Sequence, residues 1–352
     1  MRFESSALHC VLSTCVFPLF CAAVLTGLIG QAAPAAETVP LIFDTDMGND
    51  VDDAMALCMI HALESRGECR LLAVTLTKDN PYAARFVDLV NTFFGRGGIP
   101  IGTVRGGVTP EDGRYIRQTA TAEDGGRPRY PHDLLDASRA PEAVALLRST
   151  LAAADDGSVV IVQVGFSTNL ARLLESKPDD ASPLAGRDLV AKKVRLLSTM
   201  AGAFSDEMKA QRRKEYNVVQ DVEAARRLFA QWPTPIVASG WEIGNAIQHP
   251  AVSMQRDYGY VDHHPLREAY AYYRGLENDQ STYDLTSVLY AVRPDRGYFT
   301  LSEAGRITIA ADGYSEFAPA ANGNCRFLSV TPEQIVRVRE AQAWLCSQPP
   351  CK

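Results

Sequence analysis

One stretch, from Phe43 to Leu57, constrains the fold of this chain more than any other. It reads F-D-T-D-M-G-N-D-V-D-D-A-M-A-L, which is the end of a short apolar strand, a dense acidic loop and the start of an apolar helix. Five aspartates lie within ten residues: Asp44, Asp46, Asp50, Asp52 and Asp53. Carboxylates at this density repel one another unless a cation offsets their charge, and Ca²⁺ and Mg²⁺ prefer carboxylate oxygens as ligands. One or two of the five are expected to cap the helix instead. The stretch therefore predicts a hard-cation site at the carboxyl end of a strand.

The composition indicates a folded, acidic protein. The chain has 352 residues, of which 46% are hydrophobic and 22% are charged, so a sizeable core is available. The formal net charge is −7. The basic run at positions 212–214 is short, whereas binding to a nucleic-acid backbone needs a larger basic footprint. We therefore expect no nucleic-acid partner.

The N-terminus has the layout of a signal peptide. Arg2 precedes an apolar run from Val11 to Ile29, and small residues follow up to Ala36. We predict a signal peptide over residues 1–36, a single mature domain over residues 37–352, and export to the periplasm or the extracellular space. An uncleaved anchor is the alternative, because the apolar run approaches the length of a membrane-spanning helix. No comparable run follows residue 36, so we expect no stable membrane insertion after leader removal.

The cysteines suggest no redox or zinc site. Those outside the leader are Cys58, Cys69, Cys325, Cys346 and Cys351. An odd number in an exported protein leaves at least one thiol unpaired. Cys346 and Cys351 could pair with each other or with Cys325. None of the five has the C-x-x-C spacing of a zinc or redox motif.

Short apolar runs alternate with longer runs of helical period. The expected strands are 40–43, 71–77, 159–164, 194–198 and 236–239, and the expected helices are 54–65, 82–95, 141–154, 170–175 and 222–230. Apolar strands separated by helices predict an α/β fold, with a single open, mainly parallel sheet flanked by helices. Residues 298–301 and 306–310 are expected to form a C-terminal hairpin, and residues 331–347 a terminal helix. In such a sheet the ligand site lies beyond the carboxyl ends of the strands.

Several motifs, in sequence order, resemble those of the nucleoside hydrolase family, the inosine-uridine preferring type and its relatives. The family's D-x-D-P-G-x-D-D-A signature is similar to the stretch from Asp44 to Ala54, which has two extra residues before the Asp-Asp pair. Four later segments resemble, in order, the family's G-P-L-T-N, M-G-G, A-E-F-N and D-P-E-A-A motifs: Gly165–Asn169, Met200–Gly202, Lys214–Asn217 and Asp221–Ala225. The similarity extends from Pro40 to Ala310, and the chain resembles a divergent, exported member.

The resemblance implies a glycosidase that hydrolyses the N-ribosidic bond of ribonucleosides to ribose and free base, with Ca²⁺ as its cofactor. It assigns the metal to Asp46, Asp53, Asp284 and the backbone carbonyl of Thr168, and it makes Asp46 the base that deprotonates the metal-bound water. The extra residues make Asp50 a competitor for one of these carboxylate roles. The implied ribose contacts are Asp52, Asn80, Met200, Glu215 and Asn217. For the last two and Asn80, the ordinary alternative is the capping of loops and helices.

The departure from the family pattern is Tyr283, which stands where a histidine usually precedes the late aspartate. In part of the family that histidine can protonate the departing base. A neutral tyrosine can donate a proton or stack on a base, although its unperturbed pKa is about 10. His132, His263 and His264 could act as the acid instead, or lie on surface loops. The tyrosines between positions 258 and 273 could wall the base side or simply pack a helix.

Other functions remain open from the sequence. The chain could hydrolyse another N-riboside, or it could be a non-catalytic ribose- or nucleoside-binding protein that keeps the metal site but lacks an effective acid. Tyr283 motivates the second alternative. The expected partner is a small-molecule ribonucleoside in each case, and the resemblance also suggests a homo-oligomer.

Overall fold

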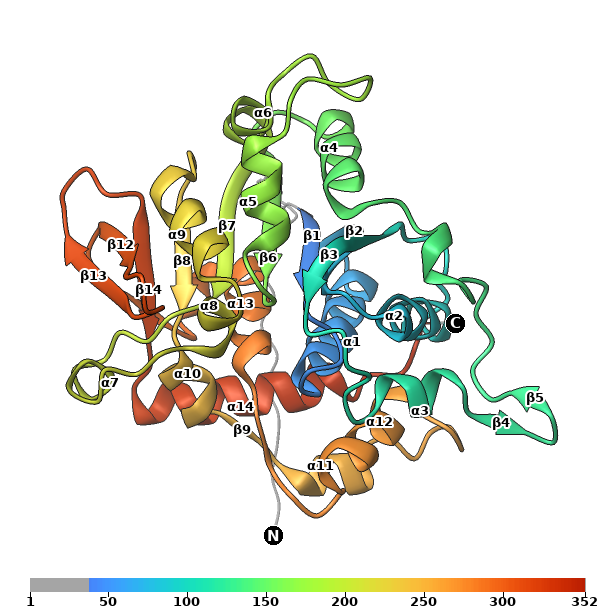
Figure 1. Cartoon of the computed structure of the whole chain (residues 1–352). Coiled ribbons are helices and arrows are strands. Elements are labelled where there is room, and N and C mark those ends of the chain that lie inside the picture. Colours follow the sequence, from blue (N-terminus) through green and yellow to red (C-terminus); the bar gives the residue numbers. More distant parts are fainter. Residues whose placement is uncertain (1–37, 352) are drawn as a thin grey trace, which may run out of the picture. The chain divides into compact units, whose positions relative to one another are not determined.

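A ten-stranded sheet runs through the computed structural model, which describes residues 38–351 (Figure 1). In spatial order its path is β13 (Ser315–Pro319), β12 (Gly305–Ile309), β14 (Cys325–Ser329), β8 (Ile236–Ser239), β7 (Val194–Met200), β6 (Val159–Gln163), β1 (Val39–Thr45), β2 (Cys69–Lys78) and β3 (Ile101–Val108), and β11 (Thr300–Leu301) pairs with β14. The strands from β14 to β3 are parallel, and β12 and β13 add an antiparallel edge. The predicted α/β fold with a single open, mainly parallel sheet is confirmed.

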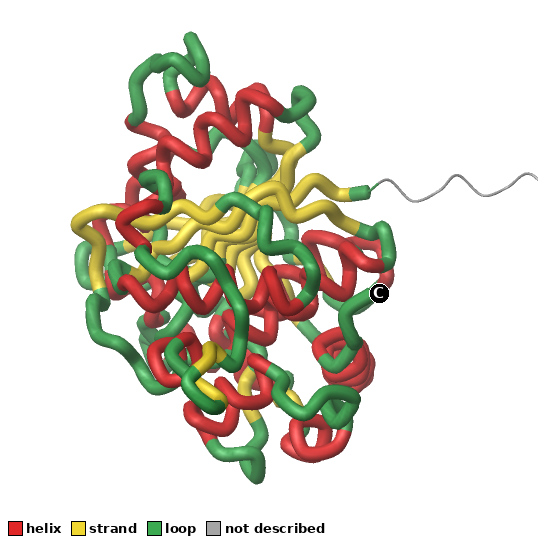
Figure 2. The backbone as a smooth tube through the Cα atoms, turned by 90° about the vertical axis from the view of Figure 1, so that its right-hand side faces the viewer, coloured by secondary structure: helices red, strands yellow, loops and turns green. Residues whose placement is uncertain are grey.

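Helices cover both faces of the sheet (Figure 2). The first hydrophobic core contains side chains from α1 (Asp52–Ser65), α2 (Pro81–Phe93), α12 (Pro265–Arg274), α13 (Tyr283–Val292) and α14 (Pro332–Cys346). The second contains side chains from α4 (Ala143–Ala153), α5 (Thr168–Glu175), α6 (Gly186–Lys193) and α9 (Val222–Gln231). The two cores therefore lie on opposite sides of one sheet.

Shorter elements connect these layers. They are α3 (Ile116–Ala120), α7 (Asp206–Ala210), α8 (Tyr216–Gln220), α10 (Trp241–Ala246), α11 (Ala251–Arg256), the 3-10 helices η1 (Ala137–Arg139) and η2 (Pro294–Arg296), and the two-residue strands β4 (Glu123–Asp124), β5 (Arg127–Pro128), β9 (Gln248–His249) and β10 (Gln280–Ser281). β4 pairs with β5, and β9 pairs with β10, outside the main sheet.

The central strand β1 shows why the sheet is covered on both sides. Leu41 and Phe43 belong to the first core, whereas Ile42 belongs to the second, and all three are fully buried. Successive side chains of a strand point to opposite faces, so an unbroken apolar run needs an apolar layer on each face. Helix α1 is buried along almost its whole length, because it packs against β2, against the neighbouring helix α13 and against α14.

The topology identifies where a ligand would bind. β1 lies between β2 and β6. The chain moves outward from β1 to β2 and β3, and then returns to β6 and continues to β7 and β8 on the other side. A reversal of this kind opens a crevice beyond the carboxyl ends of the two central strands. The acidic stretch that follows β1 therefore starts at the switch point of the sheet.

Each strand and helix predicted from the sequence is present, with ends shifted by a few residues, and the C-terminal helix begins at a Thr331 capping box. A C-terminal hairpin is also present, but the predicted partners are wrong. Residues 305–309 pair with residues 315–319, whereas Thr300 and Leu301 pair with β14. A tight turn at residues 311–314 joins the true pair, and Gly313 adopts a φ of +82° there. Strands β3, β13 and β14 of the main sheet were not predicted.

Three further expectations from the sequence concern the N-terminal segment, membrane insertion and cysteine pairing. The predicted signal peptide over residues 1–36 lies outside the described residues. Within residues 38–351, no helix combines the length and the apolar character needed to cross a membrane. The pairings considered for Cys346 are not formed, because Cys325, Cys346 and Cys351 are free thiols, as are Cys58 and Cys69.

Candidate active site

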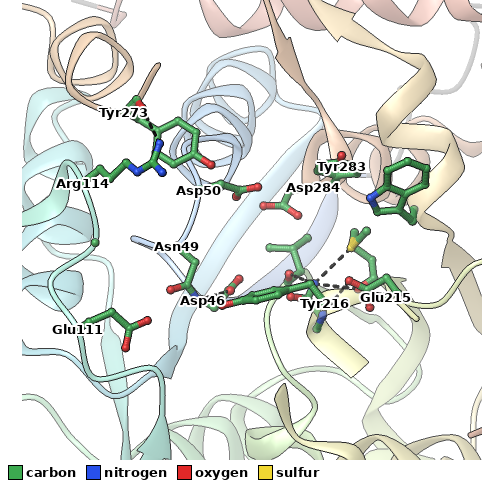
Figure 3. Close-up of a pocket in the computed structure, with 15 residues that line it drawn as sticks. Asp46, Asn49, Asp50, Glu111, Arg114, Glu215, Tyr216, Tyr273, Tyr283 and Asp284 are labelled. Atoms are coloured by element: carbon green, nitrogen blue, oxygen red, sulfur yellow. Dashed lines mark hydrogen bonds between the residues drawn. The ribbon is translucent and has the colours of Figure 1, made fainter. Parts of the chain in front are cut away.

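A cavity of about 400 Å³ lies at the switch point of the sheet (Figure 3). Asp46 follows β1, Val164 follows β6, and Met200 ends β7, and all three line it. Figure 3 shows Arg114 and Tyr273 on one side of the cavity and Glu215 and Tyr216 on the other, with acidic side chains between them. The cavity thus has the position that the sheet topology predicts.

Asp44 has a structural role at this position. Its carboxylate is fully buried and accepts hydrogen bonds from Thr75 Oγ1 (2.6 Å) and Asn169 Nδ2 (2.8 Å). Burial raises the pKa of this carboxyl to about 7, and the two hydrogen bonds oppose that shift. Asp44 ties β1 to β2 and to the start of α5, and it does not line the cavity.

Four other carboxylates converge beside the cavity. Oxygens of Asp50, Asp52, Asp53 and Asp284 all lie within 4.8 Å of one another. Asp52 also accepts a hydrogen bond from the backbone N–H of Asp284 (3.2 Å), and Asp53 accepts one from the Thr45 hydroxyl. Asp52 and Asp53 sit at the start of α1, and Asp284 sits at the start of α13, so two helix N-termini face this acidic cluster.

The electrostatics of the acidic cluster fit a cation. Burial raises the pKa of Asp52 to about 6, and burial together with neighbouring carboxylates raises the pKa of Asp53 and Asp284 well above the usual value. Asp52 Oδ1 and Asp53 Oδ2 are buried and have no hydrogen-bond partner among the described atoms. Buried, unpaired carboxylates are unfavourable, and a hard cation satisfies the free oxygens and reverses the repulsion. The acidic cluster can therefore hold a metal ion.

Asp46 lies in the same cavity but outside this four-carboxylate group. Its Oδ2 accepts a hydrogen bond from Asn49 Nδ2 (2.6 Å). Burial raises the pKa of Asp46 to about 7, while the Asn49 hydrogen bond and the charge of Lys78 oppose the shift. Of the residues predicted to bind metal, Asp53 and Asp284 thus belong to the acidic cluster and Asp46 adjoins it. Asp50 and Asp52 belong to it as well.

The predicted ribose contacts Met200, Glu215 and Asn217 form one wall of the cavity. Glu215 begins α8 and accepts backbone hydrogen bonds from Asn217 (2.7 Å), Val218 (3.1 Å) and Gly202 (3.3 Å). The Asn217 side chain donates to the carbonyl oxygens of Val164 (2.7 Å) and Met200 (3.2 Å). Burial raises the pKa of Glu215 to about 7. These side chains are capping groups and cavity-lining groups at once.

Four predicted site residues are not among those that line the cavity: Asp52 and Asp53, which belong to the acidic cluster beside it, and Asn80 and Thr168. Asn80 caps α2 by accepting from the Tyr82 N–H (2.8 Å), and its amide donates to the Pro110 carbonyl (2.8 Å). Thr168 begins α5, and its hydroxyl donates to Asp221 (2.6 Å) at the start of α9. The structure brings the other predicted site residues together and places the Asn80 and Thr168 side chains in capping and loop-anchoring positions.

Aromatic side chains form part of the remaining cavity wall. Trp241 and Tyr283 both line the cavity, and their rings stack with centroids 6.2 Å apart. The Arg213 guanidinium lies 3.8 Å from the centre of the Trp241 ring. Burial raises the pKa of Tyr283, and the nearby charge of Arg213 opposes the shift. Tyr216 lies across the cavity, half exposed. These flat faces suit a planar, aromatic ligand group.

The histidines considered as alternative acids lie elsewhere. His264 caps α12 and packs against Tyr258, His263 faces Asp124 at the surface, and His132 bonds to the Tyr130 carbonyl. Among the described residues that line the cavity there is no histidine. Of the tyrosines between positions 258 and 273, only Tyr273 lines it.

Sequence reasoning missed several cavity-lining residues: Asn49, Glu111, Arg114, Tyr216 and Trp241. Trp241 follows β8 almost directly, so the rule that ligands bind beyond the carboxyl ends of strands could have identified it. Asn49 and Tyr216 stand inside recognised motifs. Glu111 and Arg114 carry no such signal, because they belong to an irregular segment after β3, a strand that was not predicted.

The chain is similar to one protein family and to several solved structures. A family model described as inosine-uridine preferring nucleoside hydrolase matches residues 41–329. Among solved structures, a plant nucleoside hydrolase, PpNRh1, is similar with a TM-score of 0.65 and 21% identity, covering 88% of this chain and 99% of that chain. An inosine-uridine preferring nucleoside hydrolase from Bacillus anthracis is similar with a TM-score of 0.61 and 17% identity, covering 88% and 100%.

A third similar structure is the type III effector protein XopQ in complex with adenosine diphosphate ribose. Its TM-score is 0.61 at 16% identity, and the match covers 89% of this chain and 95% of that chain. At these identities the structural likenesses establish the fold alone. No match was found among curated proteins.

Proposed function

The chain belongs to the inosine-uridine preferring nucleoside hydrolase family, and from this membership we propose that it hydrolyses the N-glycosidic bond of ribonucleosides to ribose and free base. One observation carries the proposal. A single cavity combines an acidic cluster able to hold a cation, a wall of hydrogen-bonding groups and a pair of stacked aromatic rings. These parts suit, respectively, a reacting sugar, its hydroxyl groups and a planar base.

We assign Ca²⁺ to the acidic cluster together with the adjoining Asp46. Asp46, Asp53 and Asp284 are the proposed carboxylate ligands, the Thr168 carbonyl is a further one, and Asp50 competes for one of the carboxylate positions. The unpartnered, buried oxygen of Asp53 and the close approach of the four carboxylates support this assignment. When bound, the cation would lower the pKa of a coordinated water and offset the negative charge of the site.

Asp46 is the proposed general base. Its carboxylate lines the cavity and is oriented by the Asn49 amide. A general base works best when its pKa lies near the working pH, and burial brings the pKa of Asp46 to about 7. Asp46 would accept a proton from the attacking water.

The proposed ribose contacts hold the sugar and stabilise its charge. Asp52, Glu215 and Asn217 would hydrogen-bond the hydroxyls, with the Met200 backbone shaping the pocket and Asn80 as a further predicted contact. Breaking the C–N bond builds oxocarbenium character on the sugar, which nearby carboxylates stabilise. A ligand that lacks a hydroxyl would leave buried polar groups unpaired, so we expect a strict requirement for ribose.

Tyr283 is the proposed acid for the departing base. It lines the cavity one residue before Asp284 and stacks with Trp241. A phenol that remains protonated can donate its O–H to a base nitrogen as the glycosidic bond breaks. Burial favours the protonated form of Tyr283.

We further propose that residues 1–36 direct export and that the mature chain acts outside the cytoplasm, because this segment has the layout of a signal peptide. The mature domain would start near residue 37. Assembly into a homo-oligomer is proposed from family membership.

Two alternatives use the same cavity. A different N-riboside could be the substrate, and the complex of XopQ with adenosine diphosphate ribose makes a larger ribose-containing ligand the relevant comparison. Arg114, which also lines the cavity, would then supply a positive charge for the added phosphate groups. A non-catalytic nucleoside-binding protein is the second alternative, and a tyrosine in place of a histidine motivates it.

The deciding experiment measures ribose release by the mature protein from a panel of purine and pyrimidine ribonucleosides, with Ca²⁺ and then with a chelator. Calcium-dependent release with multiple turnovers would support the proposed reaction. Saturable nucleoside binding without release would favour the binding protein. If neither occurs, release of the free base from adenosine diphosphate ribose and related N-ribosides tests the remaining alternative.

A further inference from the structure

Lys78 carries a buried positive charge close to the cavity. It ends β2, and its side chain is fully shielded from solvent. Its ammonium group donates to Asn49 Oδ1 (2.8 Å) and to the Thr109 carbonyl oxygen (2.7 Å), and lies 3.6 Å from Glu111 Oε1. A buried ammonium is unfavourable unless it is well paired. These three contacts pair the Lys78 ammonium and hold it in one position.

The partners of Lys78 belong to two separate loops. Asn49 lies in the segment 46–50, here called the acidic loop, and Thr109 and Glu111 lie in the segment 109–114, here called the rim loop. Asn49 also donates to Asp46 Oδ2 (2.6 Å). A continuous chain of hydrogen bonds therefore runs from the rim loop through Lys78 and Asn49 to Asp46.

The rim loop is packed tightly against the acidic loop. A Cβ atom on Gly113 would lie 2.1 Å from the Gly48 carbonyl oxygen, so only glycine allows this approach. Residues that follow Lys78 anchor the same region, because Asp79 accepts from the Gly107 N–H (2.9 Å) and Asn80 donates to Pro110 (2.8 Å). Glu111, Gly113 and Arg114 then line the cavity.

We propose that Lys78 is a positioning residue that orients Asp46 through Asn49 and holds the rim loop against the acidic loop. The inference rests on the proposed function, in which Asp46 is the base. A simple counter-charge would pair directly with carboxylates, but the two short bonds of Lys78 go to uncharged oxygens, and Glu111 is 63% exposed. The geometry therefore indicates a role in placing groups rather than only in balancing charge.

A double-mutant cycle on ribose release tests the chain of hydrogen bonds. Lys78→Met and Asn49→Ala are each expected to lower kcat on the order of tenfold to a hundredfold, because a misplaced group loses much of its catalytic effect. If Lys78 acts through Asn49, the double variant is no slower than the slower single variant. A parallel cycle of Lys78→Met with Tyr283→Phe should be multiplicative. Multiplicative losses with Asn49→Ala, or a wild-type kcat in Lys78→Met, would overturn the proposal.

Lys78→Arg separates position from charge. This variant keeps the cation but cannot reproduce the same bonds. Positioning predicts a clear loss of kcat, whereas a counter-charge role predicts wild-type kcat and would overturn the proposal. The variant also carries the kinetic test if Lys78→Met does not fold. Lys209→Met, which removes an exposed lysine paired with Asp206, is the matched control and should behave as wild type.

Hydrogen–deuterium exchange gives a readout that does not depend on activity. In Lys78→Met or Lys78→Arg, amides in both the acidic loop and the rim loop should exchange faster, while those of the β12–β13 pair should not change. Faster exchange in neither loop, or in one loop only, would contradict the link. If the wild-type protein releases no ribose, the proposed function fails, and the exchange result still decides whether Lys78 joins the two loops.

Discussion

Asp44 and Asp46 stand two positions apart, and the structure gives them different roles. Asp44 is still within β1, where hydroxyl and amide groups from a neighbouring strand and helix satisfy it. Asp46 follows the end of β1, where the chain leaves the sheet and the side chain meets the cavity. At the residue scale, the position relative to the strand end thus decides the role: Asp44 within β1 is structural, whereas Asp46 directly after it is a candidate base. The acidic stretch indicated a cation site, but the sequence did not show which aspartate has which role.

Asp46→Asn tests the role of this carboxylate. The amide cannot accept the proton from water, so kcat should fall by on the order of 10²–10⁴-fold. The variant should remain folded, because the change removes one of several buried like charges. Ribose release and thermal unfolding measure the two effects. Asp206→Asn, at an exposed carboxylate, is the control, and full activity of Asp46→Asn would show that Asp46 is not the base.

Tyr283→Phe tests the proposed acid. The ring and its stack on Trp241 are kept, but the donor is lost, so kcat for ribonucleosides should fall by on the order of 10²-fold. A riboside with a leaving group that needs no proton, such as 4-nitrophenyl riboside, should be hydrolysed at nearly the wild-type rate. The comparison of the two rates is the measurement. An equal loss for both substrates would contradict the role of Tyr283 as a proton donor.

At the scale of elements, the strands and helices of the parallel sheet were predictable because each carries its own apolar period. Val159–Gln163 and Ile236–Ser239 are buried on both faces, and an unbroken apolar run indicates such a strand. β3 was missed because its sequence contains Gly102, Gly106 and Gly107, which interrupt the apolar pattern. The rim loop follows this strand, so its cavity residues were missed as well.

Gly113→Ala tests the contact between the rim loop and the acidic loop. The added Cβ would meet the Gly48 carbonyl, and the φ of +66° is strained for alanine. We expect a loss of stability of about 1–3 kcal/mol and a lower kcat/KM for ribonucleosides. Urea unfolding and steady-state kinetics measure these effects.

Gly125→Ala is the matched control for this change. Gly125 has a similar φ of +59°, but a Cβ there meets no atom within 4 Å. Backbone strain is thus common to both variants, and only Gly113→Ala adds the clash. Equal effects of the two substitutions on kcat/KM would show that the loop contact does not shape the cavity.

At the scale of the whole molecule, the buried carboxyl groups link stability to pH. The pKa of Asp46 rises from 3.8 to about 7 on folding, and that of Glu215 from 4.5 to about 7. At pH values between the unfolded and the folded pKa, these two carboxyl groups are ionised in the unfolded chain but still protonated in the folded chain. Unfolding then releases protons, so the stability of the metal-free protein should fall as the pH rises toward 7, and level off above it.

Calcium should reverse this trend. The ion binds ionised carboxylates and competes with protons, so the rise in Tm on adding Ca²⁺ should be larger at about pH 8 than at about pH 5. Scanning calorimetry with Ca²⁺ and with a chelator across this range measures the difference. A rise in Tm that is independent of pH, or larger in acid, would contradict ionised carboxylates as the cation ligands.

The sequence by itself determined the class of fold and the chemical character of the site. Apolar periodicity predicts which segments become strands and helices, and a dense run of aspartates after a strand predicts a cation site, because both signals are local. Family motifs in order located Glu215, Asn217 and Asp284, which the structure brings into one cavity.

Only the tertiary structure decided how distant segments meet. It placed Asp284 beside Asp52, stacked Trp241 on Tyr283, and joined Lys78 to both the acidic loop and the rim loop. It also placed the Asn80 side chain in a helix cap rather than in the cavity wall. Such contacts depend on strand order and on the path of irregular loops, which no local pattern encodes. The hydrophobic period of a segment depends on its own residues, whereas the segments that it contacts in space depend on the packing of the whole chain.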